Sequence, residues 1–285
     1  MKKIYLAAGC FWGTQAYFKK IDGVVNTKVG YANGKTEDTD YTRVSSTDHA
    51  ETLMVEYDEK RISLRKILLH YFRIIDPTSV NRQGEDVGRQ YRTGIYYTDE
   101  NDKDMIDNVY RYYEDKFGGI VVEVKLLQNF ILAEDYHQDY LDKNPNGYCH
   151  VDLSLLNLDE ESYSIMKENN TERPFSSELN KENRDGIYVD KQTKEPLFSS
   201  KDKFDAGCGW PSFRKPIGDS VDYLEDHSYG MDRVEVRSKS GDNHLGHVFN
   251  EEQGLRYCIN GKSLEFIPYE DMKKRGYEEY MKFVK

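Results

Sequence analysis

Apolar side chains recur with two different periods along the first 155 residues. At residues 52–57 they alternate with polar ones, which predicts a half-buried strand with Leu53, Val55 and Tyr57 on one side. Residues 64–75 repeat with helical spacing instead, and Asp76-Pro77 ends the helix they predict. By the same criteria we expect strands at residues 3–8, 24–31, 52–57, 91–97 and 120–124, and helices at 14–20, 64–75, 104–117 and 133–142. Up to residue 97 the order is β-α-β-β-α-β, that of a ferredoxin-like α/β sandwich.

The pattern changes after residue 155. Residues 156–170 are acidic and polar with weak periodicity, which predicts a linker. Beyond it, short apolar runs are separated by turn residues, and we expect strands at residues 186–189, 195–199, 233–237, 244–249, 254–260 and 263–267, with a closing helix at 269–284. The expected fold class is α+β, with a ferredoxin-like α/β sandwich at residues 1–155 and a mainly antiparallel β domain with a C-terminal helix at residues 171–285.

Composition narrows the functional classes. The net charge of -11 and the lack of a Lys/Arg cluster argue against nucleic-acid binding. No apolar run approaches the length of a membrane span, and the run at residues 4–9 is too short for a signal peptide. Four cysteines without a C-x-x-C pair favour neither a cysteine-rich zinc site nor a disulfide scaffold. We expect a few functional thiols, kept reduced in the cytoplasm.

Cys10 lies at the junction between a short apolar strand and a helix. Gly9 and Gly13 allow a sharp turn there, and the aromatic residues Phe11 and Trp12 stand beside the sulfur. The free N–H groups and the positive end of the helix dipole favour a thiolate. A lone cysteine in an apolar run is also compatible with a buried core residue, but the glycines and aromatic rings favour a reactive thiol.

Polar residues from separate loops and strands are placed to converge on Cys10: Tyr41, Glu51, Asp86 and Tyr91. A carboxyl group and phenols beside a thiolate suit a substrate oxygen that must be bound, protonated and expelled. The competing interpretation is structural, because the chain has 23 tyrosines. His137 is likewise more simply interpreted as a packed residue of the predicted helix than as a catalytic base.

The second half of the chain contains a more specific pattern of residues, on the strand that holds Cys258. Period-two alternation puts Arg256, Cys258 and Asn260 on one face of a strand, while residues 255, 257 and 259 point toward a core. A thiol between Arg and Asn has polar, electropositive surroundings, which lower its pKa.

Two further motifs accompany this strand. His244 and His247 are placed to orient Cys258 or exchange protons with it, and a metal site is the less favoured alternative because no further ligand accompanies the two imidazoles. Cys208 lies beside Trp210 on a glycine-flanked loop, where a mobile resolving thiol is needed.

The motifs in the two halves of the chain resemble those of two known enzyme families. Residues 1–155 resemble methionine sulfoxide reductase A through residues 9–13, 48–51, 90–92 and 133–137. Residues 160–268 resemble methionine sulfoxide reductase B through residues 171–175, 207–213, 244–249 and 256–260. The chain is therefore similar to a bifunctional A/B fusion, in which the first domain reduces the S epimer of methionine sulfoxide and the second the R epimer.

For the first domain, the resemblance assigns attack on sulfur to Cys10, which becomes a sulfenic acid. It assigns resolution of that acid as a disulfide to Cys149, and protonation of the oxygen to Glu51. The other implied residues hold the methyl group or the oxygen of the substrate: Phe11, Trp12, Tyr41, Asp86 and Tyr91.

For the second domain, it assigns the attack to Cys258 and resolution to Cys208, with Trp210 on the methyl group. The residues that bind or protonate the oxygen are His244, His247, Arg256 and Asn260. Thioredoxin or a similar dithiol would reduce both disulfides. The implied enzyme is a cytoplasmic monomer without a bound cofactor, acting on free methionine sulfoxide or on oxidised proteins in repair after oxidative stress.

This sequence also departs from the family pattern. Many B domains hold a structural zinc with two C-x-x-C pairs, but the matching residues 189–192 and 238–241 contain no cysteine, so we expect a zinc-free form. Glu251 stands where aspartate is often found.

Two rival classes stay open on the residues alone. One is a hydrolase or transferase that uses Cys10 with His49 or His137, and the other is a non-enzymatic module with structural disulfides. The even division of the four cysteines between the two halves favours the reductase.

Overall fold

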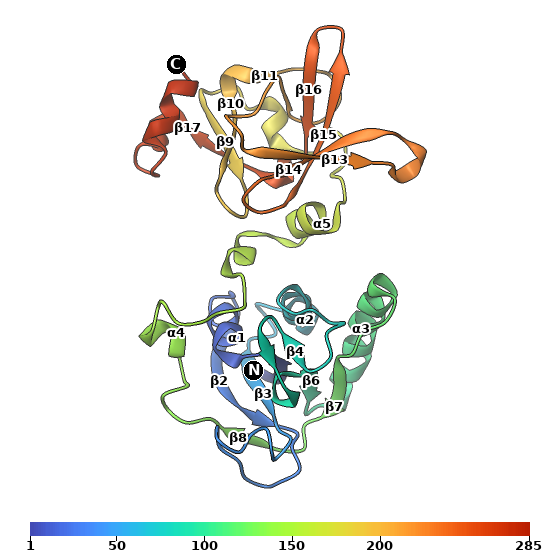
Figure 1. The fold of residues 1–285 in the computed structure, drawn as a ribbon, viewed down its shortest axis with the longest axis vertical. Coiled ribbons are helices and arrows are strands. Elements are labelled where there is room, and N and C mark those ends of the chain that lie inside the picture. Colours follow the sequence, from blue (N-terminus) through green and yellow to red (C-terminus); the bar gives the residue numbers. More distant parts are fainter. The chain divides into compact units, whose positions relative to one another are not determined.

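The computed structural model describes residues 1–285, apart from the side chain of Tyr229. The chain forms two compact units, Met1–Leu153 and Ser154–Lys285, which are considered one at a time (Figure 1). As expected, the class is α+β, with a mixed α/β first unit and a mainly antiparallel β second unit. No helix among the described residues combines the length and apolar character needed to cross a bilayer.

A six-stranded sheet in the order β7-β6-β1-β3-β2-β8 forms the centre of the first unit. Its strands are β1 (Lys2–Ala8), β2 (Val24–Ala32), β3 (Ala50–Tyr57), β6 (Thr93–Tyr97), β7 (Glu123–Leu126) and β8 (Phe130–Leu132). Strand β1 pairs antiparallel with both β3 and β6, and only the β6–β7 pair is parallel. The small ladder of β4 (Arg82–Gln83) and β5 (Asp86–Val87) lies in the connection to β6.

The helices of this unit are α1 (Phe11–Phe18), α2 (Leu64–Arg73), α3 (Lys103–Phe117) and α4 (Tyr140–Lys143). Helix α2 follows the predicted period: Ser63 caps its first turn, and its apolar stripe is buried. Helix α3 ends at Gly118, whose φ of 69° is the left-handed conformation that glycine adopts readily. Helix α1 begins three residues earlier than expected, with Cys10 as its N-cap residue.

The predicted helix at residues 133–142 is wrong over most of its length. Only α4 is helical there, and the residues before it form turns. The side chain of Gln138 explains the difference, because its amide bonds both the N–H and the C=O of Val29 on β2. Asp139 then takes a left-handed φ of 53°, which separates the turns from α4.

Two sheets build the second unit, in the orders β10-β9-β17 and β11-β12-β16-β15-β14-β13. The strands are β9 (Gly186–Asp190), β10 (Pro196–Ser199), β11 (Lys203–Phe204), β12 (Ser212–Phe213), β13 (Val221–Asp226), β14 (Arg233–Ser238), β15 (His244–Glu251), β16 (Gly254–Ile259) and β17 (Leu264–Pro268). All their pairings are antiparallel. Tyr257 and Ile259 enter the shared core as expected, but Leu255 is 45% exposed near the hairpin end.

Helical segments at both ends of this unit differ from expectation. The stretch expected as a linker contains α5 (Glu160–Glu168), which is capped by Asp159 and buries Ile165 and Met166. The closing helix is shorter than expected: α6 (Tyr269–Met272) is separated from a 3₁₀ segment, Glu278–Phe283, by a turn at Gly276 with a φ of 85°.

Candidate active sites

The fold of the first unit places an acid beside the predicted nucleophile. Cys10 follows β1 directly, and Glu51 is the second residue of the neighbouring strand β3. The carboxylate Oε2 of Glu51 accepts a hydrogen bond of 3.1 Å from the backbone N–H of Phe11 in the first turn of α1. Cys10 is 6% exposed and Glu51 only 2%.

Burial raises the pKa of Glu51 to about 8, although the Phe11 N–H acts in the opposite direction. Most Glu51 side chains are therefore protonated at neutral pH, so the residue can donate a proton while buried.

The expectation of a lowered pKa at Cys10 is wrong for the resting structure. Burial raises the pKa of this thiol, and the charges of Glu51 and Asp86 raise it further, against the effect of the Trp12 N–H. The helix N-terminus is present as predicted, but the desolvation and the carboxylates outweigh it. Because the charge of Glu51 opposes that of Cys10, a thiolate at Cys10 is favoured while Glu51 is protonated.

The other residues predicted for this site lie within electrostatic reach of the pair. Burial and then the charge of Glu51 raise the pKa of both Tyr41 and Tyr91, and the charges of Cys10 and Asp86 add to this. Asp86 likewise raises the pKa of Glu51. The structure thus brings Cys10 and the four polar residues predicted to converge on it into one neighbourhood.

An aromatic cluster surrounds the start of α1. The indole of Trp12 stacks on Tyr140 with ring centroids 3.8 Å apart, and its Nε1–H donates to Nδ1 of His137 at 3.0 Å. The ring of His137 also lies 5.2 Å from that of Phe11 and 4.6 Å from that of Tyr41. His137 is therefore a packing residue that orients the aromatic rings, and its bond to Trp12 leaves Nδ1 without the lone pair a base would use.

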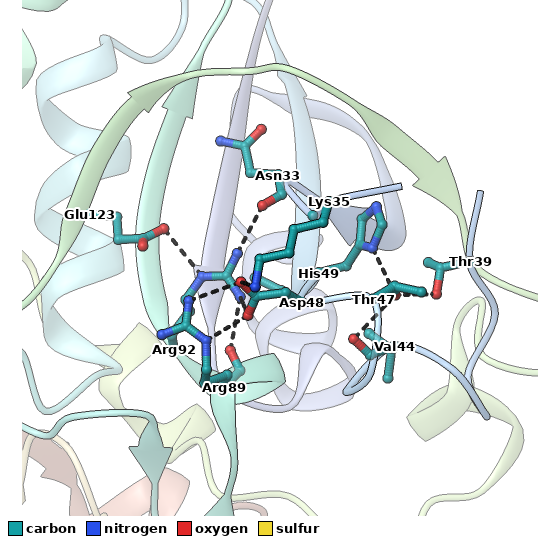
Figure 2. A network of polar contacts seen from close by, with 12 residues as sticks. Asn33, Lys35, Thr39, Val44, Thr47, Asp48, His49, Arg89, Arg92 and Glu123 are labelled. Carbon is teal, nitrogen blue, oxygen red and sulfur yellow. Dashed lines mark hydrogen bonds and ion pairs between the residues drawn. The ribbon is translucent and has the colours of Figure 1, made fainter. Parts of the chain in front are cut away.

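A network of ion pairs ties the loop before β3 to the segment that carries Tyr91 (Figure 2). Arg89 donates to both carboxylate oxygens of Asp48, at 2.5 and 3.2 Å. The buried guanidinium of Arg92 bonds Glu123 at 3.2 Å and the backbone C=O groups of Asn33 and Arg89 at 3.1 and 3.0 Å. Neither arginine was predicted to position this loop. The motif at residues 90–92 contains Arg92, so one of the two arginines could have been identified from the sequence.

The expected resolving residue Cys149 lies close to the same helix. Its thiol is reduced and partly buried, and it donates to the C=O of Val151 at 3.2 Å. A Cβ atom built on Gly13 would lie 2.9 Å from its sulfur, so Cys149 packs directly on the first turn of α1.

In the second unit the two predicted thiols are in contact. Cys258 lies on β16 and Cys208 in the loop before β12, and their sulfur atoms are 3.6 Å apart. Both are reduced. The pairing of Ser212 with Cys258 across β12 and β16 fixes this approach, and the hydroxyl of Ser212 lies 3.4 Å from the Cys208 sulfur.

The expectation of a lowered pKa at Cys258 is wrong for the resting structure. Burial raises the pKa of Cys258 to about 12, and the neighbouring Cys208 raises it as well, while Arg256 lowers it. Burial also acts to raise the pKa of Cys208, but bonds from Ser212, the Trp210 N–H and Cys258 lower it overall. The pKa of Cys208 is therefore lowered and that of Cys258 raised in the reduced pair.

Two histidines on β15 are each held by a carboxylate from another strand of the same sheet. Nε2 of His247 lies 2.7 Å from Oδ2 of Asp226, and Nδ1 of His244 lies 2.6 Å from Oε1 of Glu235. Because His247 pairs with Cys258 across β15 and β16, the first of these imidazoles stands beside the sulfur. Neither carboxylate was predicted from the sequence, since only the folded sheet places β14 beside β15 and β13 beyond β14.

A pocket of about 120 Å³ opens beside Cys258 and is lined by Trp210, His247 and Asn260. The amide of Asn260 accepts from the N–H of Glu172 at 3.1 Å and donates to the C=O of Leu245 at 3.1 Å. The C=O of Glu172 in turn accepts from the Trp210 indole at 3.2 Å. Glu172, in the motif at residues 171–175, therefore holds Asn260 and Trp210, two of the residues that line the pocket, through its backbone.

Two of the predicted residues lie outside this pocket. Arg256 lines a separate hollow that Cys208 also borders, where it donates to Glu251 at 2.6 Å and covers the ring of Phe249 at 4.6 Å. His244 borders a neighbouring hollow together with His247.

The turns that hold zinc in related domains are linked here by hydrogen bonds. Asn243 donates to Oδ2 of the buried Asp190 at 2.9 Å, and Ser240 donates to Thr193 at 2.9 Å. This donor set lacks thiolates and does not fit a structural zinc. Among the side chains that the structure describes, no group of three or more His, Cys, Asp or Glu is arranged to hold a metal ion.

Comparisons with known proteins find two different families along the chain. The model of the family "Peptide methionine sulfoxide reductase" matches residues 2–169, and that of the "SelR domain" matches residues 158–268. The reduced form of Mxr1 from Saccharomyces cerevisiae is 43% identical over 52% of this chain and 88% of that chain, with a TM-score of 0.50. Methionine sulfoxide reductase A of Corynebacterium diphtheriae is 35% identical over 52% of this chain and 77% of that chain, with a TM-score of 0.49. The chain therefore belongs to the peptide methionine sulfoxide reductase family, as an A-type reductase domain followed by a B-type SelR domain in one bifunctional chain.

Proposed function

We propose that the first site reduces the S epimer of methionine sulfoxide and the second site the R epimer. The observation that carries the proposal is the buried Glu51, largely protonated at neutral pH, beside Cys10 at the start of α1. A sulfoxide oxygen is a poor leaving group until it is protonated, and this pair supplies a nucleophile and an acid together.

In the first site the sulfur of Cys10 attacks the sulfoxide sulfur. Glu51 gives its proton to the oxygen, with the phenols of Tyr41 and Tyr91 as further donors and Asp86 beside them. The transient bond between the two sulfur atoms and the S–O bond of the substrate then break, and the protonated oxygen passes to Cys10. Methionine leaves, and Cys10 is oxidised by two electrons to a sulfenic acid. Phe11 and Trp12 hold the methyl group, and the stack of Trp12 on Tyr140 fixes its plane.

In the second site Cys258 attacks, and the walls of its pocket match the substrate. Trp210 packs on the methyl group, while His247 and Asn260 face the oxygen. Asp226 holds the imidazole of His247 in place at 2.7 Å. On attack the proton of Cys258 passes by way of His247 to the sulfoxide oxygen, which ends on Cys258 as the sulfenic acid. Cys208 lies 3.6 Å away as the resolving thiol. Arg256 supports the thiolate charge, and His244 steadies His247.

Both sulfenic acids end as disulfides in the proposed cycle. A thiolate of Cys149 or Cys208 attacks the oxidised sulfur, the new S–S bond replaces the S–O bond, and the oxygen leaves as water with one added proton. A dithiol reductant of the thioredoxin type then restores the thiols. We further propose a cytoplasmic, monomeric, zinc-free protein that accepts free or protein-bound substrate. Its domains would span residues 1–155 and 171–285, and the order β6-β1-β3-β2 supports a ferredoxin-like core for the first.

The test is the consumption of the separate S and R epimers of a methyl sulfoxide with dithiothreitol. Cys10→Ser should lose only S-epimer reduction and Cys258→Ser only R-epimer reduction. If one substitution removed both activities, the two-site proposal would fail. A hydrolase using Cys10 would instead accumulate an acyl-enzyme without any reductant, and the engagement of His137 by Trp12 argues against it.

A further inference from the structure

Three glycines form a slot for the segment that carries Cys149. A Cβ atom on Gly13 would meet the sulfur of Cys149 at 2.9 Å, and one on Gly9 would lie 3.3 Å from Nε2 of His150. A Cβ atom on Gly84 would come within 3.2 Å of the His150 Cβ. Gly9 and Gly13 flank Cys10 in the sequence, so the same glycines that shape the turn at the nucleophile also admit the resolving segment.

The side chain of His150 anchors this segment to the strand that precedes Cys10. It is 6% exposed, and its Nε2 lies 3.1 Å from the backbone C=O of Ala8, the last residue of β1. Because a carbonyl oxygen only accepts hydrogen bonds, Nε2 carries the proton and donates it. Nδ1 then faces Oδ2 of Asp86 at 4.0 Å.

The two atoms that face each other, Nδ1 of His150 and Oδ2 of Asp86, are buried without any hydrogen-bond partner. Two such unpaired polar atoms are costly, so the position of this imidazole is not explained by packing alone. Burial and the charge of Asp86 raise the pKa of Tyr148, the residue on the other side of Cys149. Asp86 therefore lies against both neighbours of the resolving cysteine.

We propose that His150 is a positioning residue for the resolving step in the first site, because its bond to Ala8 holds Cys149 against the first turn of α1 before Cys10 is oxidised. The inference rests on the proposed role of Cys149. In that step the Cys149 thiolate attacks the sulfur of the Cys10 sulfenic acid, the S–S bond forms, the S–O bond breaks, and the oxygen takes up a proton and leaves as water. Both electrons come from Cys149, so no external reductant is needed.

The test follows the two steps separately in the full-length protein without reductant. S-epimer substrate is added, methionine formed in the first turnover is measured, and the products are divided into Cys10–Cys149 disulfide and dimedone-trapped sulfenic acid. His150→Leu removes the donor, and His150→Gln is the matched control because its amide N–H can reach the same carbonyl. Reduction of the R epimer at the second site is measured in the same samples and should stay unchanged.

His150→Leu should form methionine at the wild-type rate but form the disulfide about tenfold more slowly, the effect of about one lost hydrogen bond, and it should accumulate the dimedone adduct. His150→Gln should restore disulfide formation. If His150→Leu formed the disulfide at the wild-type rate, or if both steps slowed equally, the inference alone would be overturned. If Cys149→Ser accumulated no sulfenic acid, the proposed role of Cys149 would fall as well.

Discussion

The acid role of Glu51 makes the sharpest prediction. Its pKa is raised from 4.5 to about 8 by burial, a shift that corresponds to about 5 kcal/mol against the charged form. Glu51 should therefore be about nine-tenths protonated at pH 7 and about one-tenth at pH 9. Because the pKa of Cys10 is also raised, reduction of the S epimer should rise with pH as the Cys10 thiolate forms, and it should stop rising above about pH 8, where Glu51 loses its proton.

Glu51→Gln separates the acid from its electrostatic effect. Glutamine keeps an oxygen for the Phe11 N–H but has no proton to transfer, so the S-epimer rate should fall by about 10²- to 10⁴-fold. At pH 9, where the wild-type Glu51 is mostly charged, alkylation of Cys10 by iodoacetamide should become faster in the variant, because that charge raises the pKa of Cys10. The assay compares the two rates in the same preparation. Equal losses of reduction and alkylation would refute the argument.

The raised pKa of Glu51 also predicts how the stability of the folded protein depends on pH, and this dependence shows whether the Glu51→Gln variant is correctly folded. The folded protein holds the Glu51 proton more tightly than the unfolded chain, so stability from this group is present below pH 4.5 and is lost as pH rises to about 8. Glu51→Gln should therefore unfold at a higher temperature than the wild type at pH 9. An unfolding temperature below that of the wild type at pH 9 would contradict the proposed burial cost.

Three other predictions follow from the contacts around the two sites. Arg92→Leu removes bonds to Glu123 and to two backbone carbonyls, and it should lower S-epimer kcat/KM about tenfold while the R-epimer rate stays constant in the same assay. Asp226→Asn should lower R-epimer turnover and the pKa of His247, since the bond from Asp226 raises that pKa; an NMR titration of the imidazole measures it, and an unchanged pKa would argue against the pair. Asn243→Ala should lower the free energy of unfolding of the second unit by about 1–3 kcal/mol, and a chelator should leave the wild-type Tm unchanged.

The elements that were predicted well are those whose pattern is local. The helical stripe of α2 follows from the burial of one face, and the glycines around Cys10 identify a strand-to-helix turn. Strand β3 forms where it was expected, but it is buried on both faces and not only on one. The helix expected at residues 133–142 failed because a distant partner, Val29, binds the side chain of Gln138. Such side-chain bonds to another strand leave no periodic trace in the sequence.

The residues of the sites were easier to identify than their electrostatics. Strand order and register bring Glu51 to Cys10 and His247 to Cys258, and the motifs contained these residues. The pKa directions of Cys10 and Cys258 could not be predicted, because they depend on burial and on charges contributed by other strands and loops. Asp226 and His150 were missed for the same reason, since their partners lie far away in the sequence.

The central claim is that each unit holds a complete pair of nucleophile and resolving thiol. The most direct measurement adds excess racemic methyl sulfoxide to the reduced protein without reductant, and counts sulfide formed and thiols lost per chain. The account predicts one equivalent of sulfide from each epimer and the loss of all four thiols that the sequence provides. Cys10→Ser should lose only the S-epimer equivalent. A single equivalent per wild-type chain, or loss of both equivalents in Cys10→Ser, would contradict two independent sites.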